Sequence, residues 1–138
     1  MTDLELAQEI FAREAPMFVL VREGRELARG ALPGVREFVA TLQRLGADAR
    51  GASLADKVVG KAVAIAAAHA GIIAIATPLA SELTTQTCMA HGIALHAARI
   101  VPRIKNATGD GLCPMESLVL GIAEPLAAVA ALRQKLNL

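Results

Sequence analysis

The middle third of the chain carries very little charge, and this constrains the fold more than any other sequence feature. Residues 51–101 hold five charged side chains, whereas residues 1–50 hold fifteen. Within Val58–Ala70 all but three residues are apolar, and Ile72–Ala76 is a short apolar run. A helix that is apolar on every side is buried on most of them, and a short apolar run after it is typical of a buried parallel strand. The sequence therefore predicts a buried helix and a buried strand at the centre of the fold.

Length and composition limit the partners. The 138 residues match one ordinary domain, 1–138, which buries roughly two-thirds of the surface of its unfolded chain. Apolar residues make up 54% of the chain and aromatic residues 2%, so the core must consist of Ala, Val, Leu and Ile. Without Trp or Tyr the chain lacks platforms for stacking bases, and a net charge of +1 gives no general attraction to anions. We therefore expect neither a nucleic acid nor a membrane as partner.

Cysteine usage and the N-terminal segment predict a cytoplasmic protein. Cys88 and Cys113 are too few for a disulfide framework, and acidic residues interrupt the N-terminal segment where a signal peptide would be apolar. The uncharged stretch Ala62–Ala80 is long enough to cross a membrane, but its many alanines make it weakly hydrophobic. We interpret it as the buried helix followed by the buried strand.

The order of patterns predicts a mixed α/β fold. Helix signals cover residues 3–15, 35–45, 53–70, 78–89, 115–122 and 125–136, and strand signals cover 18–21, 27–28, 72–76 and 93–101. Glu23 and Gly24 supply the turn of a hairpin between the first two strands. Strands separated by helices favour parallel neighbours joined by right-handed crossovers. We expect a three-layer α-β-α sandwich around a mixed sheet of about four strands, with helices on both faces.

A polar loop that leads into a helix start, Asn106–Glu116, holds the densest cluster of reactive side chains. Cys113 has two interpretations. It can be the N-cap of a helix in which Glu116 reaches back to complete the cap, or it can be a nucleophile with Glu116 or Asp110 handling protons. Asn106 and Asp110 can likewise hold a ligand or satisfy the backbone of their own turn. These alternatives stay open at the level of sequence.

Two lysines mark the start of the predicted buried helix. Ser53–Asp56 has the form of a capping box, which places Lys57 and Lys61 four residues apart on one helical face. The pair suits a bound anion or a carboxylate brought by another segment, such as Asp110 or Glu116, although both side chains can also extend into solvent. Gly60 between them lowers helix propensity, which indicates the close approach of another backbone or of a ligand.

A metal site is not expected. Cys88, His91 and His96 lie close together in the sequence, but a histidine at a helix C-terminus and a cysteine in the core account for them. A zinc site usually shows three or four clear ligands. We predict no metal and no other cofactor.

Two long segments carry a resemblance to a known family. Gly51–Ala64 and Val101–Glu116 are similar to the hallmark segments of a small uncharacterised prokaryotic family, a domain of unknown function with a cytidine deaminase-like fold. Zinc deaminases open the buried helix with His-x-Glu or Cys-x-Glu and continue with Pro-Cys-x-x-Cys. The corresponding places here hold Asp56 with Lys57 and Pro78–Ser81. The resemblance thus implies the fold without zinc-dependent deamination.

The resemblance also implies where a pocket would lie. It would be lined by Lys57, Lys61 and Ser81, with Glu82 as a further candidate, and the loop from Asn106 would close it. We expect a small anionic or nucleotide-like ligand there, and the residues named for this site are Asp56, Lys57, Lys61, Ser81, Asn106 and Asp110 for binding, with Cys113 and Glu116 for metal-independent catalysis. The alternative is a non-catalytic regulatory or assembly module that forms a homo-oligomer.

Overall fold

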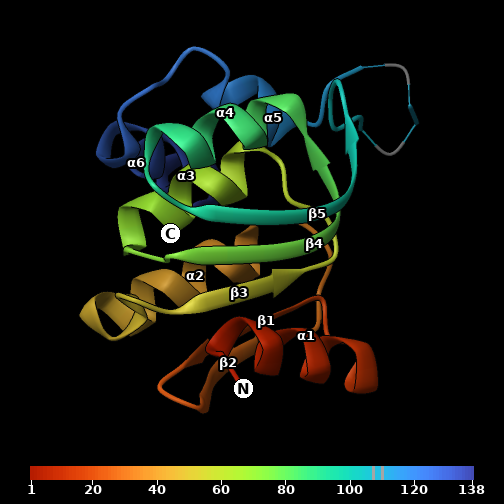
Figure 1. Cartoon of the computed structure of the whole chain (residues 1–138). Helices are drawn as coiled ribbons and strands as arrows, with labels where there is room; N and C mark the ends of the chain where they lie inside the picture. Colours follow the sequence, from red (N-terminus) through yellow and green to blue (C-terminus); the bar gives the residue numbers. More distant parts are fainter. Residues whose placement is uncertain (107, 110) are drawn as a thin grey trace.

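The computed structural model describes residues 1–106, 108–109 and 111–138. The strands are β1 (Phe18–Arg22), β2 (Arg25–Gly30), β3 (Ser53–Asp56), β4 (Ala74–Ser81) and β5 (Ala94–Val101). The helices are α1 (Asp3–Glu14), α2 (Arg36–Leu45), α3 (Lys61–Ala70), α4 (Glu82–Ala90), α5 (Pro114–Val119) and α6 (Pro125–Leu136), and a short 3-10 helix, η1 (Gly46–Ala49), follows α2. The strands form one sheet in the order β2-β1-β3-β4-β5 (Figure 1).

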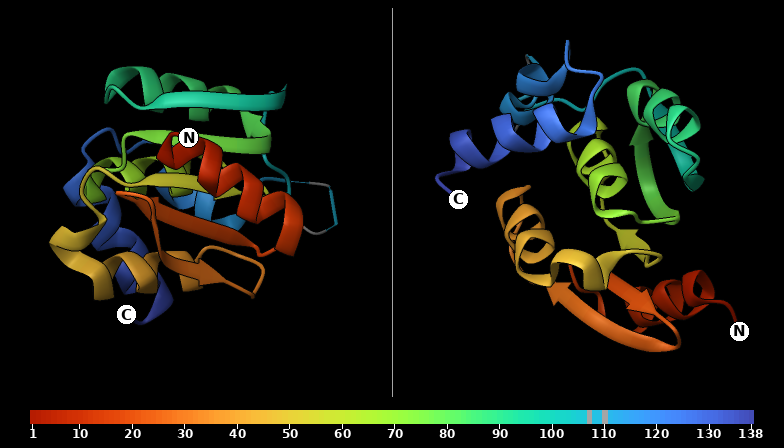
Figure 2. Two further views of the ribbon diagram at one scale, coloured as in Figure 1. Left: turned by 60° about the horizontal axis from the view of Figure 1, so that its bottom comes forward. Right: turned by 90° about the vertical axis from the view of Figure 1, so that its left-hand side faces the viewer.

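The sheet is mixed and covered on both faces, which confirms the predicted three-layer α/β architecture. β1 runs antiparallel to β2 and β3, whereas β3, β4 and β5 run parallel. Helix α1 lies across one face by itself, and the other helices pack on the opposite face (Figure 2). The sheet has five strands rather than about four. The additional strand is β3, which the sequence pattern places in a helix.

The segment Ser53–Asp56 shows why the capping-box prediction was wrong. All four residues are buried and pair with β1 on one side, and the first three also pair with β4 on the other. A Ser-x-x-Asp pattern indicates a helix start only where the backbone is not already paired in a sheet, and here the central position of β3 decides. Helix α3 begins later, at Lys61, with Gly60 at its N-cap. Lys57 therefore precedes the helix and does not share a helical face with Lys61.

The predicted buried helix is confirmed. Every residue of Ala62–Ala67 in α3 is buried. The helix contacts α2, α4, α5 and α6 and belongs to the larger of two apolar clusters, while α1 covers the smaller one. Because most of its side chains are alanines, neighbouring helices can approach α3 closely from several sides.

The helix predicted to begin at Pro78 begins later. Strand β4 continues through Pro78 to Ser81, and α4 follows from Glu82. Thr77 and Leu79 pair with β5 whereas Pro78 does not, so the missing N–H of the proline falls between ladder positions. Ser81 is the N-cap of α4 and forms a capping box with Thr84.

The hairpin and the closing helix agree with the sequence patterns. Glu23 and Gly24 both have positive φ, of 52° and 73°, as a tight two-residue hairpin turn requires. Helix α6 spans the predicted residues 125–136. None of the helices in the described part of the chain is both long enough and apolar enough to cross a membrane.

Candidate functional site

A pocket of about 330 Å³ lies at the carboxyl end of β3. One part of its wall is Asp56, Lys57 and Gly60, and another is Cys113 with Glu116. The two segments singled out in the sequence, one before α3 and one before α5, thus meet in space. The carboxyl ends of parallel strands are a frequent place for ligands in α/β folds. We refer to this site as the Asp56 pocket.

Asp56 is a buried carboxyl group without a charged partner. Its side chain is 9% exposed, and Val58 N donates a long hydrogen bond of 3.4 Å to its Oδ1. No ion pair involves Asp56 in residues 1–106, 108–109 and 111–138. Burial raises the pKa of the carboxyl group from 3.8 to about 7, and hydrogen bonds from the backbone of Val58 and Lys57 oppose part of this increase. Asp56 can therefore exchange a proton near neutral pH.

Glu116 is buried as well, but its carboxylate is fully engaged. Lys61 N donates to Oε1 at 2.7 Å and Ala62 N donates to Oε2 at 2.8 Å. These are free N–H groups in the first turn of α3, where a negative charge is also favoured by the helix dipole. Glu116 of α5 thus caps a helix 55 residues away in the sequence. The capping interpretation predicted that Glu116 reaches back to the start of its own helix, and this prediction is wrong.

The Glu116 carboxylate also explains Gly60. A Cβ atom at Gly60 would lie 2.5 Å from the Glu116 carboxyl carbon, closer than real contacts allow. The φ of Gly60 is −91°, which any residue can adopt, so the requirement for glycine is space alone. A close approach at Gly60 is confirmed, but the approaching group is the Glu116 side chain and not the backbone or ligand that the sequence predicted.

Cys113 occupies the N-cap position of α5, as predicted, with Pro114 as the first helical residue. Its thiol makes no capping hydrogen bond. The side chain is half-buried and lies in the wall of the Asp56 pocket. The structure therefore places Cys113 in the pocket wall without a capping role for its thiol.

The remaining predicted residues are not all brought to the pocket. Lys57 lines it and is exposed, but Lys61 does not line it and donates from Nζ to Leu120 O at 3.1 Å. Ser81 is fully buried, and its Oγ lies 2.9 Å from the hydroxyl of Thr84, which in turn donates to Val59 O. Ser81 thus caps α4, Thr84 links that helix to the segment before α3, and Ser81 is absent from the pocket lining.

Asn106 shapes its own turn. Its Oδ1 accepts hydrogen bonds from Gly109 N at 2.9 Å and from the Thr108 hydroxyl at 3.1 Å. This is the role expected of Asn in a tight connection. Asp110 lies outside the described residues.

The zinc-binding motifs of deaminases, His-x-Glu or Cys-x-Glu and Pro-Cys-x-x-Cys, do not occur in the sequence. Within the residues that the structure describes, no group of three or more His, Cys, Asp or Glu side chains is placed to hold a metal.

Comparison with known proteins places the chain in a family. A family model described as TM1506, a domain of unknown function (DUF1893), matches residues 6–136. The chain belongs to this DUF1893 family. No curated protein matches the sequence significantly. The family membership confirms the resemblance to a domain of unknown function.

Solved structures agree with the fold of this DUF1893 protein. The crystal structure of a DUF1893 family protein (TM1506) from Thermotoga maritima aligns with a TM-score of 0.87 at 22% identity, over 98% of this chain and 91% of that one. A diaminohydroxyphosphoribosylaminopyrimidine deaminase/5-amino-6-(5-phosphoribosylamino)uracil reductase from Thermotoga maritima aligns with a TM-score of 0.43 at 17% identity, over 67% of this chain and 34% of that one. A deaminase is thus a structural neighbour, but so low a TM-score carries no functional argument.

The sequence pattern does not reveal the state of Asp56. The pattern places Asp56 in a capping box and among the binding residues, and it does not predict a carboxyl group whose pKa is raised by burial. The available signal is an acid that directly follows the apolar residues Leu54 and Ala55. Recognising it requires knowing that Ser53–Asp56 is a central strand.

Proposed function

We propose that this chain binds a small, largely apolar molecule in the Asp56 pocket, with a nitrogen of that molecule donating a hydrogen bond to Asp56. One observation carries the proposal: a buried carboxyl group with no charged partner among the described residues lines a concave, mostly aliphatic pocket. Burying such a group costs free energy unless a partner compensates it. Groups of this kind concentrate at functional sites.

The shape and lining of the pocket support a compact ligand. A volume of about 330 Å³ lies at the lower end of the range for small-molecule sites. Most of the wall is apolar, with Phe18, Leu32, Val35, Val63 and Ile104 among its members. A planar heterocycle or a short amine would place carbon against these residues and a nitrogen against Asp56. The proposal keeps the heterocyclic part of the nucleotide-like ligand expected from the sequence and gives up its anionic part.

Charge favours a neutral or cationic group over an anion at this place. Asp56 and Glu116 both contribute carboxyl groups to the wall, and Glu116 already occupies the first N–H groups of α3. Lys57 is the one lysine in the lining, since Lys61 is directed to Leu120. An anion here would face two carboxyl groups and one exposed ammonium.

A reaction at this site would use Asp56 as a general acid or base. A pKa of about 7 lies near the optimum for proton transfer at neutral pH. Cys113 lies on the same pocket wall and is the candidate nucleophile, whereas the oxygens of Glu116 are both occupied by backbone N–H groups. The catalytic form of the proposal therefore rests on Asp56 and Cys113, and Glu116 is a positioning residue.

The test is a thermal-shift screen of heterocycles, amines, nucleosides and carboxylates at about pH 6 and about pH 8. The wild-type protein is compared with Asp56→Asn and with Asp48→Asn, which removes an exposed acid that does not line the pocket. We expect nitrogen-containing ligands to raise the melting temperature of wild type and of Asp48→Asn, and to lose most of this effect in Asp56→Asn. If carboxylates stabilise the protein equally in all three variants, the proposal is wrong.

An assembly module remains the second candidate, favoured by the free edge of the sheet. Within the described residues β5 pairs with β4 alone, and Ile100 of β5 is 49% exposed. Unpaired edge strands are templates for pairing between chains. Light scattering of wild type and Ile100→Glu tests it: a dimer that the variant converts to a monomer supports assembly, and a monomeric wild type contradicts it.

A further inference from the structure

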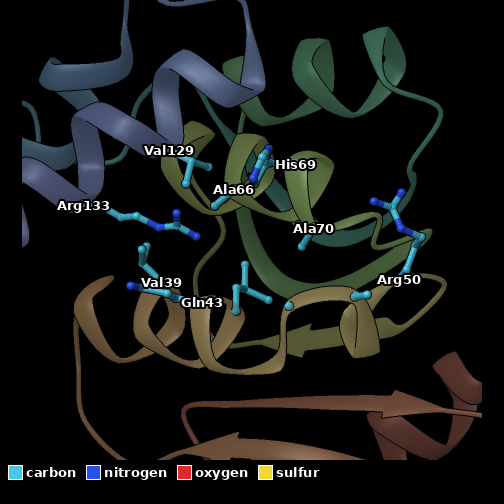
Figure 3. A pocket seen from close by; sticks show the side chains of 11 residues that line it. Val39, Gln43, Arg50, Ala66, His69, Ala70, Val129 and Arg133 are labelled. Carbon is cyan, nitrogen blue, oxygen red and sulfur yellow. The ribbon is translucent and has the colours of Figure 1, made fainter. Parts of the chain in front are cut away.

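A second pocket lies in the helical layer, between α2, η1, α3 and α6. It encloses about 200 Å³. Its polar lining side chains are Gln43, Arg50, His69 and Arg133, and the other lining residues are aliphatic or glycine (Figure 3). None of the lining residues in the described part of the chain is acidic. We call this site the Arg133 groove.

Arg133 is the central polar group of the groove. Its side chain extends from α6 toward the space between Val39 of α2 and Ala66 of α3 (Figure 3). Its Nε is buried and finds no hydrogen-bond acceptor among residues 1–106, 108–109 and 111–138. A guanidinium donor removed from water without an acceptor is unfavourable, and the cost is larger for a charged group than for a neutral one.

Ion pairs involve only some of the arginines. Arg13, Arg22 and Arg29 each lie within ion-pair distance of a glutamate. Among the described residues Arg50 and Arg133 make no such pair, and neither do Arg25, Arg36, Arg44, Arg99 and Arg103. The feature that distinguishes Arg133 is therefore its buried Nε without an acceptor.

Helix ends explain part of the arrangement. Arg133 lies in the last turn of α6 and His69 in the last turn of α3, where the helix dipole favours a cation. This accounts for positive charge near each helix end. It does not account for a buried Nε without an acceptor, nor for Arg50, which belongs to neither helix.

We propose that the Arg133 groove binds a small organic anion, whose phosphate or carboxylate oxygens bond to the guanidinium of Arg133. The planar fork of arginine matches both kinds of oxygen pair. Arg50 lies at the opposite end, beyond Ala70 (Figure 3), and adds longer-range attraction. Val39, Leu42 and Val129 give the carbon part of the ligand an apolar surface. This site is separate from the Asp56 pocket, and the inference does not depend on the function proposed for that pocket.

The test titrates the full chain with inorganic phosphate, glycerol phosphate and malonate at constant ionic strength. The readouts are the melting temperature and the Nε–H resonance of Arg133 in NMR spectra. The variants are Arg133→Gln and Arg50→Gln, with Arg44→Gln as the matched control, because Arg44 is exposed and does not line the groove. Ala47→Leu adds bulk at an exposed lining position and leaves every charge in place.

We expect at least one anion to bind saturably and to shift the Arg133 resonance. Its affinity should fall about tenfold or more in Arg133→Gln, about threefold in Arg50→Gln and negligibly in Arg44→Gln. If Arg133→Gln does not fold, a loss of binding in Ala47→Leu supports the groove in its place. Equal losses in Arg133→Gln and Arg44→Gln, or the absence of saturable binding by all three anions, would overturn the proposal. A preference for glycerol phosphate or for malonate identifies the ligand class.

Discussion

Asp56 and Glu116 are buried carboxyl groups of the same pocket, and the chain holds them in opposite ways. Glu116 accepts two short backbone hydrogen bonds from α3, whereas Asp56 accepts a long one from Val58. Glu116 is 4% exposed and Asp56 is 9% exposed, so the two are buried to a similar degree. The hydrogen bonds that compensate their burial are nevertheless very different. Burial alone therefore does not identify a functional acid. The group that the fold leaves uncompensated is the better candidate.

Removal of the Glu116 carboxylate should have the largest effect. Glu116→Ala leaves the amides of Lys61 and Ala62 without acceptors and removes a charge from the N-terminus of α3. We expect the free energy of unfolding to fall by about 5 kcal/mol, measured by urea denaturation. Glu116→Gln keeps one carbonyl oxygen and should lie between this variant and wild type. A loss below about 1 kcal/mol for Glu116→Ala would show that the contact does not hold α3 in place.

Replacement of Asp56 should act in the opposite direction. Its pKa rises from 3.8 in the unfolded chain to about 7 in the fold, so the fold favours the protonated form. The stability that this preference contributes is complete below about pH 4 and is lost as the pH rises through about 7. Asp56→Asn stays neutral, so its advantage over wild type should grow between these values, to about 4 kcal/mol at most.

Denaturation of both proteins at a series of pH values measures this difference. Asp48→Asn is the control, because Asp48 is exposed and should give a difference that hardly changes with pH. If Asp56→Asn is less stable than wild type at pH 8, the carboxylate has a compensating partner and the comparison with Glu116 no longer holds.

Gly60→Ala tests the same contact from the other side. A methyl group would meet the Glu116 carboxylate, and we expect a loss of about 2 kcal/mol in the free energy of unfolding. The cost should fall in the Glu116→Ala background, because the side chain that collides with the methyl group is gone. A double-mutant cycle measures this coupling, which we expect to be about 1 kcal/mol or more. If the losses of Gly60→Ala and Glu116→Ala are additive, the cost of Gly60→Ala arises in the backbone and not in a collision with Glu116.

The sequence predicts well what depends on neighbours in the chain. The hairpin at Glu23 and Gly24, the buried run Ala62–Ala67 and the bounds of α6 follow from local turn chemistry, side-chain size and capping. The sequence also predicts that the segments around Asp56 and Cys113 line one pocket, and in the structure both residues line it. The helix start predicted at Ser53–Asp56 is wrong, because strand pairing with β1 and β4 outweighs a local helix signal.

Long-range contacts decide the site residues and are hidden in the sequence. Nothing near Glu116 indicates that it caps a helix 55 residues earlier, and nothing near Lys61 indicates that it turns to Leu120. The residues Ser81–Thr84 contain the signal for a helix cap at Ser81. Pro78, three residues earlier, is an equally good signal for a helix start, and the prediction from sequence followed it. A short sequence pattern can therefore indicate that a residue caps a helix, but it does not show which helix the residue caps.

Cys113 lies in the same pocket wall as Asp56 and Glu116, and its replacement should have the smallest effect. Its thiol makes no capping hydrogen bond, although its backbone φ and ψ of −53° and 135° suit an N-cap. Serine at this position can accept a hydrogen bond from the first turn of α5, so Cys113→Ser should raise the free energy of unfolding by about 0.5 kcal/mol. Cys113→Ala is the control and should not gain. If serine destabilises the protein by more than alanine does, the sulfur is packed as an apolar group, and Cys113 then resembles the fixed Glu116 more than the uncompensated Asp56.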